Sequence, residues 1–399
     1  MTKKRLIKQS FHFWVTYMKK TFLTFSTVLL ILISCYPTFA QSQRLDSLIQ
    51  SGIHRIYSLQ FEEAEETFSI VKENYPRHPS GKFFTAMITW WKIMVDLDNE
   101  SYDDEFIDQL NESIDFCDEI LDEDPGNIDA VFFKGGSLGF RGRLESFRED
   151  WLDAAADGKD ALPLVHRAYE LDPKNVDVQL GFGIYNYYAD VIPEQYPFLK
   201  PVMFFFPKGD KEKGIEQLQN AAENGKYTSI ESKYFLMTLF YKFEDDNQTA
   251  LKYAEELFND FSNNPVFHKY YARLLRGTSH LSKSAEQFRI IYNRCDSTFF
   301  GYNDKLKREA SYYIADDYWR DAEFEQAIKY YKECSDLSYS FNQPDDGFNV
   351  NALLQLGKVY DILGNREKAK EYYQIVLDLD KYRDSHEQAE KYLEVPFKR

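Results

Sequence analysis

The stretch NVNALLQLGKVYDILGNREKAKEYYQIVLDLDKY, residues 349–382, decides the fold of this chain. Leu353, Leu356 and Tyr360 recur at helical spacing and form one apolar stripe. Gly364 and the asparagine after it supply a turn, because both residue types tolerate a left-handed backbone. The stretch therefore predicts two short helices joined by a tight turn.

The two predicted helices carry small residues where they are expected to face each other. Ala369 and Tyr373 lie four residues apart and share one face of the second helix, while Gly357 lets that helix approach the first closely. In order and spacing, these residues resemble a tetratricopeptide repeat, a helix–turn–helix unit of about 34 residues. One such unit cannot bury its own apolar face, so the resemblance implies an array of at least about three.

Comparable patterns recur along the chain from residue 45 onward. They predict an all-α, tetratricopeptide-type superhelical solenoid of about eight helix pairs over residues 41–399, with a short amphipathic helix at 384–393 covering the last pair. The predicted pairs fall at 45–78, 80–122, 128–175, 176–225, 230–263, 265–296, 307–340 and 349–382.

A proline-rich insert at 190–209 interrupts the fourth pair. Four prolines in this segment oppose one continuous helix. The insert also contains Phe204, Phe205 and Phe206, a short apolar run with lysines nearby. We expect these three rings to pack largely against neighbouring helices rather than against lipid.

The third pair has an unusual density of glycine within a predicted helix, at positions 135, 136, 139 and 142. Each such glycine costs up to about 1 kcal/mol relative to alanine. Two explanations remain open. The glycines allow close packing of helices, or they form a backbone-lined ligand site.

Residues 1–40 have the features of an export signal. Two lysines precede the apolar run 22–33, and the small-x-small sequence at 38–40 predicts cleavage before Gln41. The run is about 12 residues long, which is too short to span a bilayer comfortably. Met18 directly precedes the two lysines and is a plausible true start of the protein.

Two other fates of this segment remain open. Cys35 ends a sequence that resembles a bacterial lipobox, in which this cysteine is lipidated and becomes the new N-terminus. Alternatively, the segment is retained as an anchor. Cleavage at Gln41 and lipidation at Cys35 both predict an exported protein that is periplasmic or associated with the outer membrane, with no membrane span in the mature chain.

The chain is acidic. Residues 1–40 hold six Lys/Arg and no Asp/Glu, so their removal changes the formal net charge from −17 to −23. Contacts to phosphate need clustered cations, and this charge therefore opposes binding to nucleic acid.

No catalytic, cofactor or metal motif occurs in the sequence. There is no phosphate-binding loop, no His-Glu-x-x-His, no Cys-x-x-Cys and no Gly-x-Ser-x-Gly. The histidines are scattered without metal-ligand spacing, and three separate cysteines in the mature chain do not form a disulfide framework. We therefore predict no enzyme activity, no cofactor and no metal.

The first helix of each unit lines the concave groove in the proteins that the chain resembles, which implies a partner-binding surface here. Lys269, Arg273 and Arg276 share one helix face, and both arginines are expected to be exposed. The face is either merely solvated or a site for an acidic peptide, a C-terminal carboxylate or another anion. The predicted groove residues are Phe235, Lys242, Phe243, Lys269, Arg273, Arg276, Tyr312, Trp319 and Arg320.

The sequence thus predicts a non-enzymatic protein-interaction scaffold or adaptor of the bacterial cell envelope. Its concave groove is expected to bind a protein or peptide partner, with an acidic partner as one option. One alternative is an envelope protein that binds a small molecule or glycan, with or without a lipid anchor. Another is an enzyme, which a buried convergent polar pocket would favour.

Overall fold

The computed structural model describes residues 43–204, 206–297 and 299–399. Within these residues every regular element is helical and no strand occurs, so the predicted all-α class is confirmed. None of the described helices is both long enough and apolar enough to cross a bilayer. The predicted export signal at 1–40, with Met18, Cys35 and the cleavage at Gln41, lies outside the described residues.

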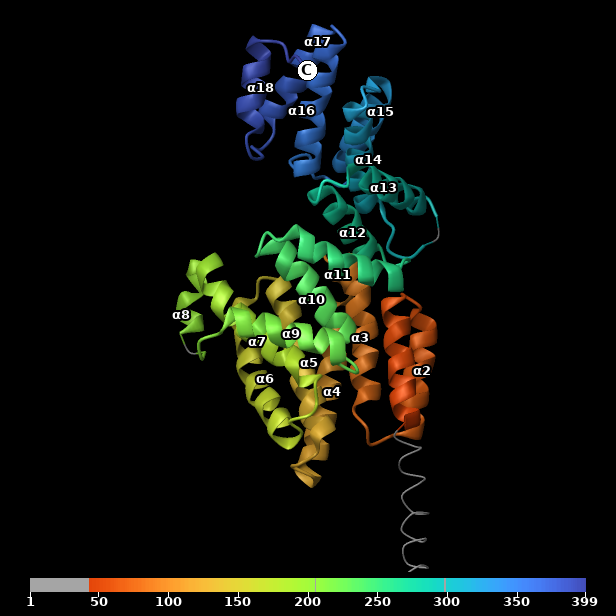
Figure 1. The fold of residues 1–399 in the computed structure, drawn as a ribbon, viewed down its shortest axis with the longest axis vertical. Coiled ribbons are helices and arrows are strands. Elements are labelled where there is room, and N and C mark those ends of the chain that lie inside the picture. The colour runs from red at the N-terminus through yellow and green to blue at the C-terminus, as the bar shows by residue number, and fades with distance from the viewer. Residues whose placement is uncertain (1–42, 205, 298) are drawn as a thin grey trace, which may run out of the picture.

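The helices pack as consecutive pairs, which confirms the predicted helix-pair solenoid (Figure 1). Residues 43–57 are helical and precede α2 (Phe61–Asn74). The last pair is covered by α18 (Ser385–Glu394). The pairs between are α3 (Ser80–Val95) with α4 (Asp103–Glu123), α5 (Ile128–Phe147) with α6 (Trp151–Leu171), α7 (Val178–Gln195) with α9 (Lys211–Asn224), α10 (Ser229–Lys242) with α11 (Asn247–Asp260), α12 (Pro265–Gly277) with α13 (Leu281–Cys295), α14 (Asp304–Arg320) with α15 (Phe324–Ser340), and α16 (Gly347–Ile362) with α17 (Arg366–Asp378).

In two pairs among the described residues, a glycine on the first helix packs directly against an aromatic ring on the second helix. A Cβ atom at Gly357 would overlap the ring of Tyr373, and one at Gly52 would overlap the ring of Phe68. Both rings are fully buried. The close approach that the sequence predicted at Gly357 is therefore present, and the same contact recurs in the first pair.

The turn between α16 and α17 forms as the sequence predicts. Gly364 has φ +74°, in the left-handed region that favours glycine. The side chain of Asn365 then accepts a hydrogen bond from the backbone N–H of Lys368 and caps α17. Two residues thus end one helix and start the next.

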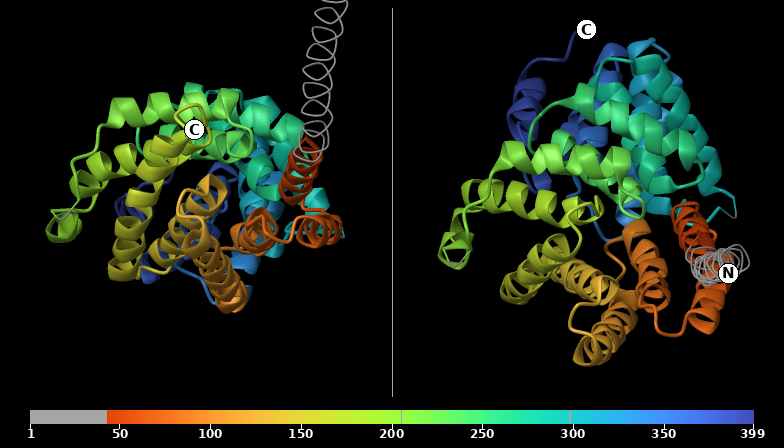
Figure 2. Two further views of the ribbon diagram at one scale, coloured as in Figure 1. Left: turned by 90° about the horizontal axis from the view of Figure 1, so that it is seen from below. Right: turned by 60° about the horizontal axis from the view of Figure 1, so that its bottom comes forward.

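The first two pairs lie against the fifth to seventh, so the superhelix curls into a ring (Figure 2). The Tyr57 hydroxyl donates to Glu231 Oε2 over 2.7 Å, and Asn264 Nδ2 donates to the carbonyl of Tyr57 over 3.0 Å. Lys305 Nζ lies 2.9 Å from Asp96 Oδ1. One continuous apolar core extends through this ring from residue 45 to residue 275, whereas the last units have cores of their own.

The proline-rich insert differs from its prediction in two respects. Helix α7 continues past residue 190 through Pro193, whose missing N–H removes one i→i−4 hydrogen bond, and the helix ends two residues later at Gln195. The segment then forms η2 (Pro197–Leu199) and α8 (Lys200–Met203).

The expectation that the phenylalanines of the insert are packed is wrong for Phe204, whose exposed fraction is 84%. The physical reason is that α8 is only four residues long and packs mainly against η2 and α7, so it offers little surface to cover this ring. Phe206 is half-buried at the edge of a cavity, and Phe205 lies outside the described residues.

Candidate functional site

A cavity of about 790 Å³ lies within the ring of helices. Its walls come from α3, α5, α6, α7 and α10, which include the first helices of four successive pairs. The lining is mainly aromatic and aliphatic, so this is an apolar concave site of ligand-binding size. Rings in its wall include Phe83, Phe140, Phe147, Tyr188, Phe235 and Phe243.

The glycine-rich helix α5 forms part of this wall, and its glycines have two roles. A Cβ at Gly135 would lie 3.3 Å from Leu164 on α6, and one at Gly142 would lie 3.1 Å from Asp157. These two positions serve close helix packing. A Cβ at Gly139, by contrast, would meet nothing within 4 Å. Gly139 therefore lines open space in the cavity, and the alternative of a backbone-lined ligand site at this position stays a prediction.

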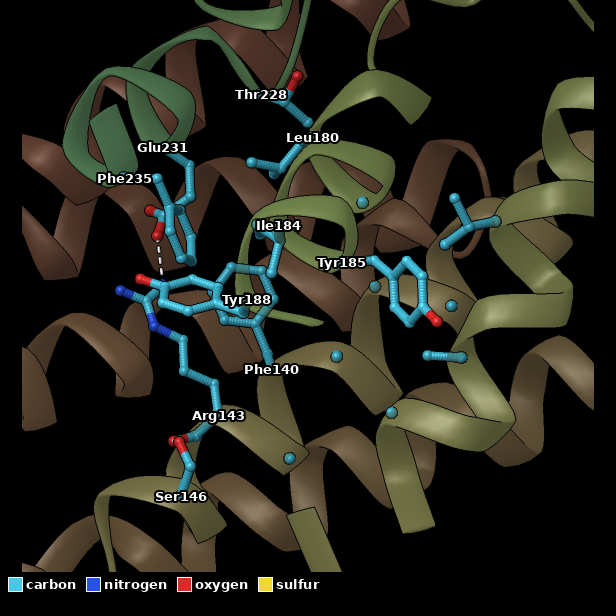
Figure 3. A pocket seen from close by; sticks show the side chains of 18 of the residues that line it. Phe140, Arg143, Ser146, Leu180, Ile184, Tyr185, Tyr188, Thr228, Glu231 and Phe235 are labelled. Atoms are coloured by element: carbon cyan, nitrogen blue, oxygen red, sulfur yellow. Dashed lines mark hydrogen bonds and ion pairs between the residues drawn. The ribbon is translucent and has the colours of Figure 1, made fainter. Parts of the chain in front are cut away.

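An ion pair between Arg143 and Glu231 lies in the cavity wall (Figure 3). Arg143 Nη1 donates to Glu231 Oε1, and the other carboxylate oxygen accepts the hydroxyl of Tyr57. The guanidinium carbon lies 4.4 Å from the ring centre of Phe235 and 4.9 Å from that of Trp90. The buried charge is thus paired and enclosed by aromatic faces, which is the arrangement that compensates its desolvation.

Spare hydrogen-bond donors remain at this point of the cavity. Among the described residues, no acceptor contacts Nε or Nη2 of Arg143, and none contacts the hydroxyl of Tyr188. Burial raises the pKa of Tyr188 to about 12, and the charge of Arg143 opposes this rise. Tyr188 is therefore protonated at neutral pH and able to donate.

The nine predicted groove residues do not form one surface. Phe235, Lys242 and Phe243 line the cavity, with Lys242 exposed at its edge. Lys269 lies nearby on α12, half-buried, with its ammonium 5.9 Å from the ring centre of Tyr270. These four predicted residues are brought together on α10 and α12.

The expectation that Arg273 and Arg276 are exposed in the free protein is wrong. Arg273 Nη2 donates to Glu309 Oε2 over 2.6 Å, and Arg276 forms an ion pair with Asp316. Both arginines are half-buried because the neighbouring first helix α14 carries a carboxylate opposite each of them. Arg320 is likewise paired, with Asp317 three residues earlier.

Tyr312 and Trp319 are also engaged within the protein. The ring of Tyr312 lies between those of Tyr331 and Phe348, with centres 5.9 Å and 5.6 Å away. The guanidinium of Arg399 lies 5.1 Å from the ring centre of Trp319. These two residues support packing of the seventh pair in the free protein.

Lys269 differs from the arginines on the same helix. Burial lowers its pKa, and the charges of Arg273 and Lys242 lower it further. Within the described part of the chain, neither Lys242 nor Lys269 has a carboxylate at ion-pair distance. Among the described residues of this face, these two lysines thus form no ion pair, although the charge of Glu309 partly offsets the lowering of the Lys269 pKa.

The sequence interpretation missed the cluster of Arg143, Glu231, Tyr57 and Tyr188. One signal for it was present. Arg143 lies between Phe140 and Phe147 at helical spacing, so the charge falls on an apolar stripe. A cation in that position indicates a buried partner, but the spacing does not identify Glu231.

Among the described residues, no group of three or more His, Cys, Asp or Glu side chains has an arrangement that could hold a metal ion.

This chain is similar to known proteins in one repeat of its sequence and in its helical fold. The family model of the tetratricopeptide repeat matches residues 351–381. These residues are a tetratricopeptide repeat. The match falls within the stretch from which the fold was predicted, and the tetratricopeptide pairing of α16 with α17 is repeated in the helix pairs before it. No curated protein sequence matches the chain.

Two solved structures illustrate how general the likeness is. The pilF protein of Pseudomonas aeruginosa is 12% identical, with a TM-score of 0.41 over 64% of this chain and 96% of that chain. A tetratricopeptide repeat protein from Parabacteroides merdae is 13% identical, with a TM-score of 0.34 over 77% of this chain and 97% of that chain. Neither likeness carries an argument about function.

Proposed function

We propose that this protein is a non-enzymatic scaffold of the bacterial cell envelope that holds an acidic segment of a partner protein on the inner face of α10 and α12. Tetratricopeptide-repeat proteins generally mediate protein–protein interactions and are typically non-catalytic. An extended or helical segment of the partner is the form that such a face accommodates.

The observation that supports this proposal is that, among the described residues, neither Lys269 nor Lys242 has a carboxylate at ion-pair distance. Lys269 is half-buried, and its pKa is lowered by burial and by neighbouring cations. A carboxylate on a partner would supply the missing counter-charge and form charge-assisted hydrogen bonds. The half-buried ring of Phe243, next to Lys242 in the cavity wall, offers contact area to the same partner.

The arginines of the same face have another role in this proposal. Arg273 and Arg276 join α12 to α14 through Glu309 and Asp316, so their charges are already used within the protein. They fix the distance between neighbouring first helices and leave the lysines to bind. The proposed binding contact therefore involves the two lysines and leaves out the two arginines of the groove predicted from the sequence.

The assignment to the envelope rests on the sequence of residues 1–40, with its apolar run and small-x-small site. The net charge of −23 in the mature chain repels acidic partners at long range. Association is therefore expected to be slow at low salt and to depend on the local field of the two lysines.

Affinity purification from envelope extracts tests the proposal. A double variant with Lys242→Met and Lys269→Met should lose the principal partner, since removing one side of a buried charge pair costs about 2–5 kcal/mol. The matched control changes two exposed lysines on second helices, Lys252→Met and Lys283→Met, and should retain the partner.

The opposite pattern would contradict the proposal. If the folded inner-face variant recovers the partner in full, the lysines do not bind it. If only the second-helix control loses the partner, binding takes place on the outer face.

A further inference from the structure

We propose that the cavity bounded by α3, α5, α6, α7 and α10 binds a single-chain amphiphile, a hydrocarbon chain ending in an oxygen acceptor such as a carboxylate. This activity goes beyond partner binding and does not depend on it. The cavity has the size of a small-molecule site, and its wall is largely apolar.

A hydrocarbon chain suits this wall better than a peptide does. Every residue of a peptide brings a backbone N–H and C=O that need partners when buried. The wall consists mainly of rings, aliphatic groups and glycine backbone, and Arg143 and Glu231 form an ion pair in it. A methylene chain needs no polar partner along its length and gains free energy from each buried methylene.

The head group is assigned from the donors that the protein leaves unused. Arg143 keeps Nε and Nη2, and Tyr188 keeps its hydroxyl, without an acceptor among the described residues. Both oxygens of Glu231 are already engaged, by Arg143 and by Tyr57. An acceptor oxygen on the ligand therefore completes the hydrogen bonding at this point without displacing the carboxylate.

A cationic head group is disfavoured by the same geometry. The faces of Trp90 and Phe235, which would otherwise attract a quaternary ammonium, already hold the guanidinium of Arg143. A second cation would be repelled by that guanidinium and by Lys242 at the cavity edge.

Titration calorimetry with linear carboxylates of eight, ten, twelve and fourteen carbons, each below its micelle concentration, tests the proposal. Affinity should rise by about fourfold per methylene until the cavity is full, the factor that corresponds to about 0.8 kcal/mol. The alkyl-trimethylammonium ion of equal chain length should bind at least about tenfold more weakly. Affinity that does not change with chain length, or a cation that binds as well as the carboxylate, would overturn the assignment.

Two substitutions at one position locate the ligand. Gly139→Phe should abolish binding by filling open space, whereas Gly139→Ala should retain it, and both should fold because a Cβ there meets no neighbour. Tyr188→Phe should weaken the carboxylate by about two- to tenfold through loss of one hydrogen bond. A folded Gly139→Phe protein that binds like the wild type would refute the cavity as the site.

The outcome is separable from that of the proposed scaffold function. Gly139→Phe should leave recovery of the protein partner unchanged, and the lysine double variant should lose the partner whether or not the amphiphile binds. If an apolar peptide bound in a Gly139→Phe-sensitive manner and the carboxylates did not, the site would be a peptide site and the amphiphile proposal would be wrong.

Discussion

Replacing two helical glycines by alanine separates the packing of the repeat from intrinsic helix propensity. Gly357 on α16 faces the ring of Tyr373, whereas Gly139 on α5 faces open space. Alanine gains about 1 kcal/mol over glycine in a helix interior at either position. The difference between the two variants therefore measures the packing contact alone.

The magnitude follows from the surroundings of Tyr373. Its side chain is fully buried, and its hydroxyl donates to Asp361 Oδ2 over 3.0 Å, so the ring has little freedom to withdraw from a new methyl group. Overpacking of this kind costs about 1–3 kcal/mol. Gly357→Ala should thus change the unfolding free energy by between zero and a loss of about 2 kcal/mol, and Gly357→Leu should lower it further. Gly139→Ala should raise the unfolding free energy by about 1 kcal/mol.

Urea unfolding followed by circular dichroism measures these free energies, with hydrogen exchange of α16 amides as a local readout. The local readout is needed because repeat arrays unfold in parts and the last units have their own core. Equal unfolding free energies for the two alanine variants would refute the packing of Gly357 against Tyr373.

Three further predictions concern charge, ring closure and export. Burial, together with the charge of Asp157, raises the pKa of Glu145 to about 7, above its unfolded value of 4.5. The contribution of this raised pKa to folding stability is therefore complete below pH 4.5 and is lost as the pH rises through 7, and Glu145→Gln should flatten this part of a stability–pH profile. Tyr57→Phe removes the donor to a buried Glu231 oxygen and should cost about 1–3 kcal/mol in thermal or urea unfolding, against no loss for the exposed Tyr339→Phe. Intact-mass measurement of envelope material should give a chain beginning at Gln41; a lipidated chain beginning at Cys35 would replace this prediction.

The fold could be predicted because its decisive signals are local. Gly357, Tyr373 and Gly364 lie within one short stretch, and each specifies a contact or a turn inside a single pair. The same spacing recurs along the chain, so the solenoid follows without knowledge of distant contacts. The insert, where Phe204 is exposed, departs from what the local pattern indicated.

The candidate site could be predicted only in part. The resemblance to the tetratricopeptide repeat implied that Phe235, Lys242 and Phe243 face the groove from the first helix of the fifth pair, and all three line the cavity. The pairing of Arg273 with Glu309 depends on how α12 and α14 are aligned, which a single-helix pattern does not specify.

The closure of the ring could not be predicted from local sequence patterns. Tyr57 and Glu231 are 174 residues apart, and their contact arises from the summed curvature of several pairs. The cavity and its Arg143 cluster depend on that curvature. For this reason, a solenoid that was expected to present an open groove instead encloses a site.

Photo-crosslinking in cells is the measurement that tests the central claim most directly. A benzoylphenylalanine in place of Phe243, on the inner face, should yield a discrete adduct with the envelope partner, and the same probe in place of the exposed Ile290 on α13 should yield none. An adduct from position 290 without one from position 243 would contradict binding of the partner on the inner face.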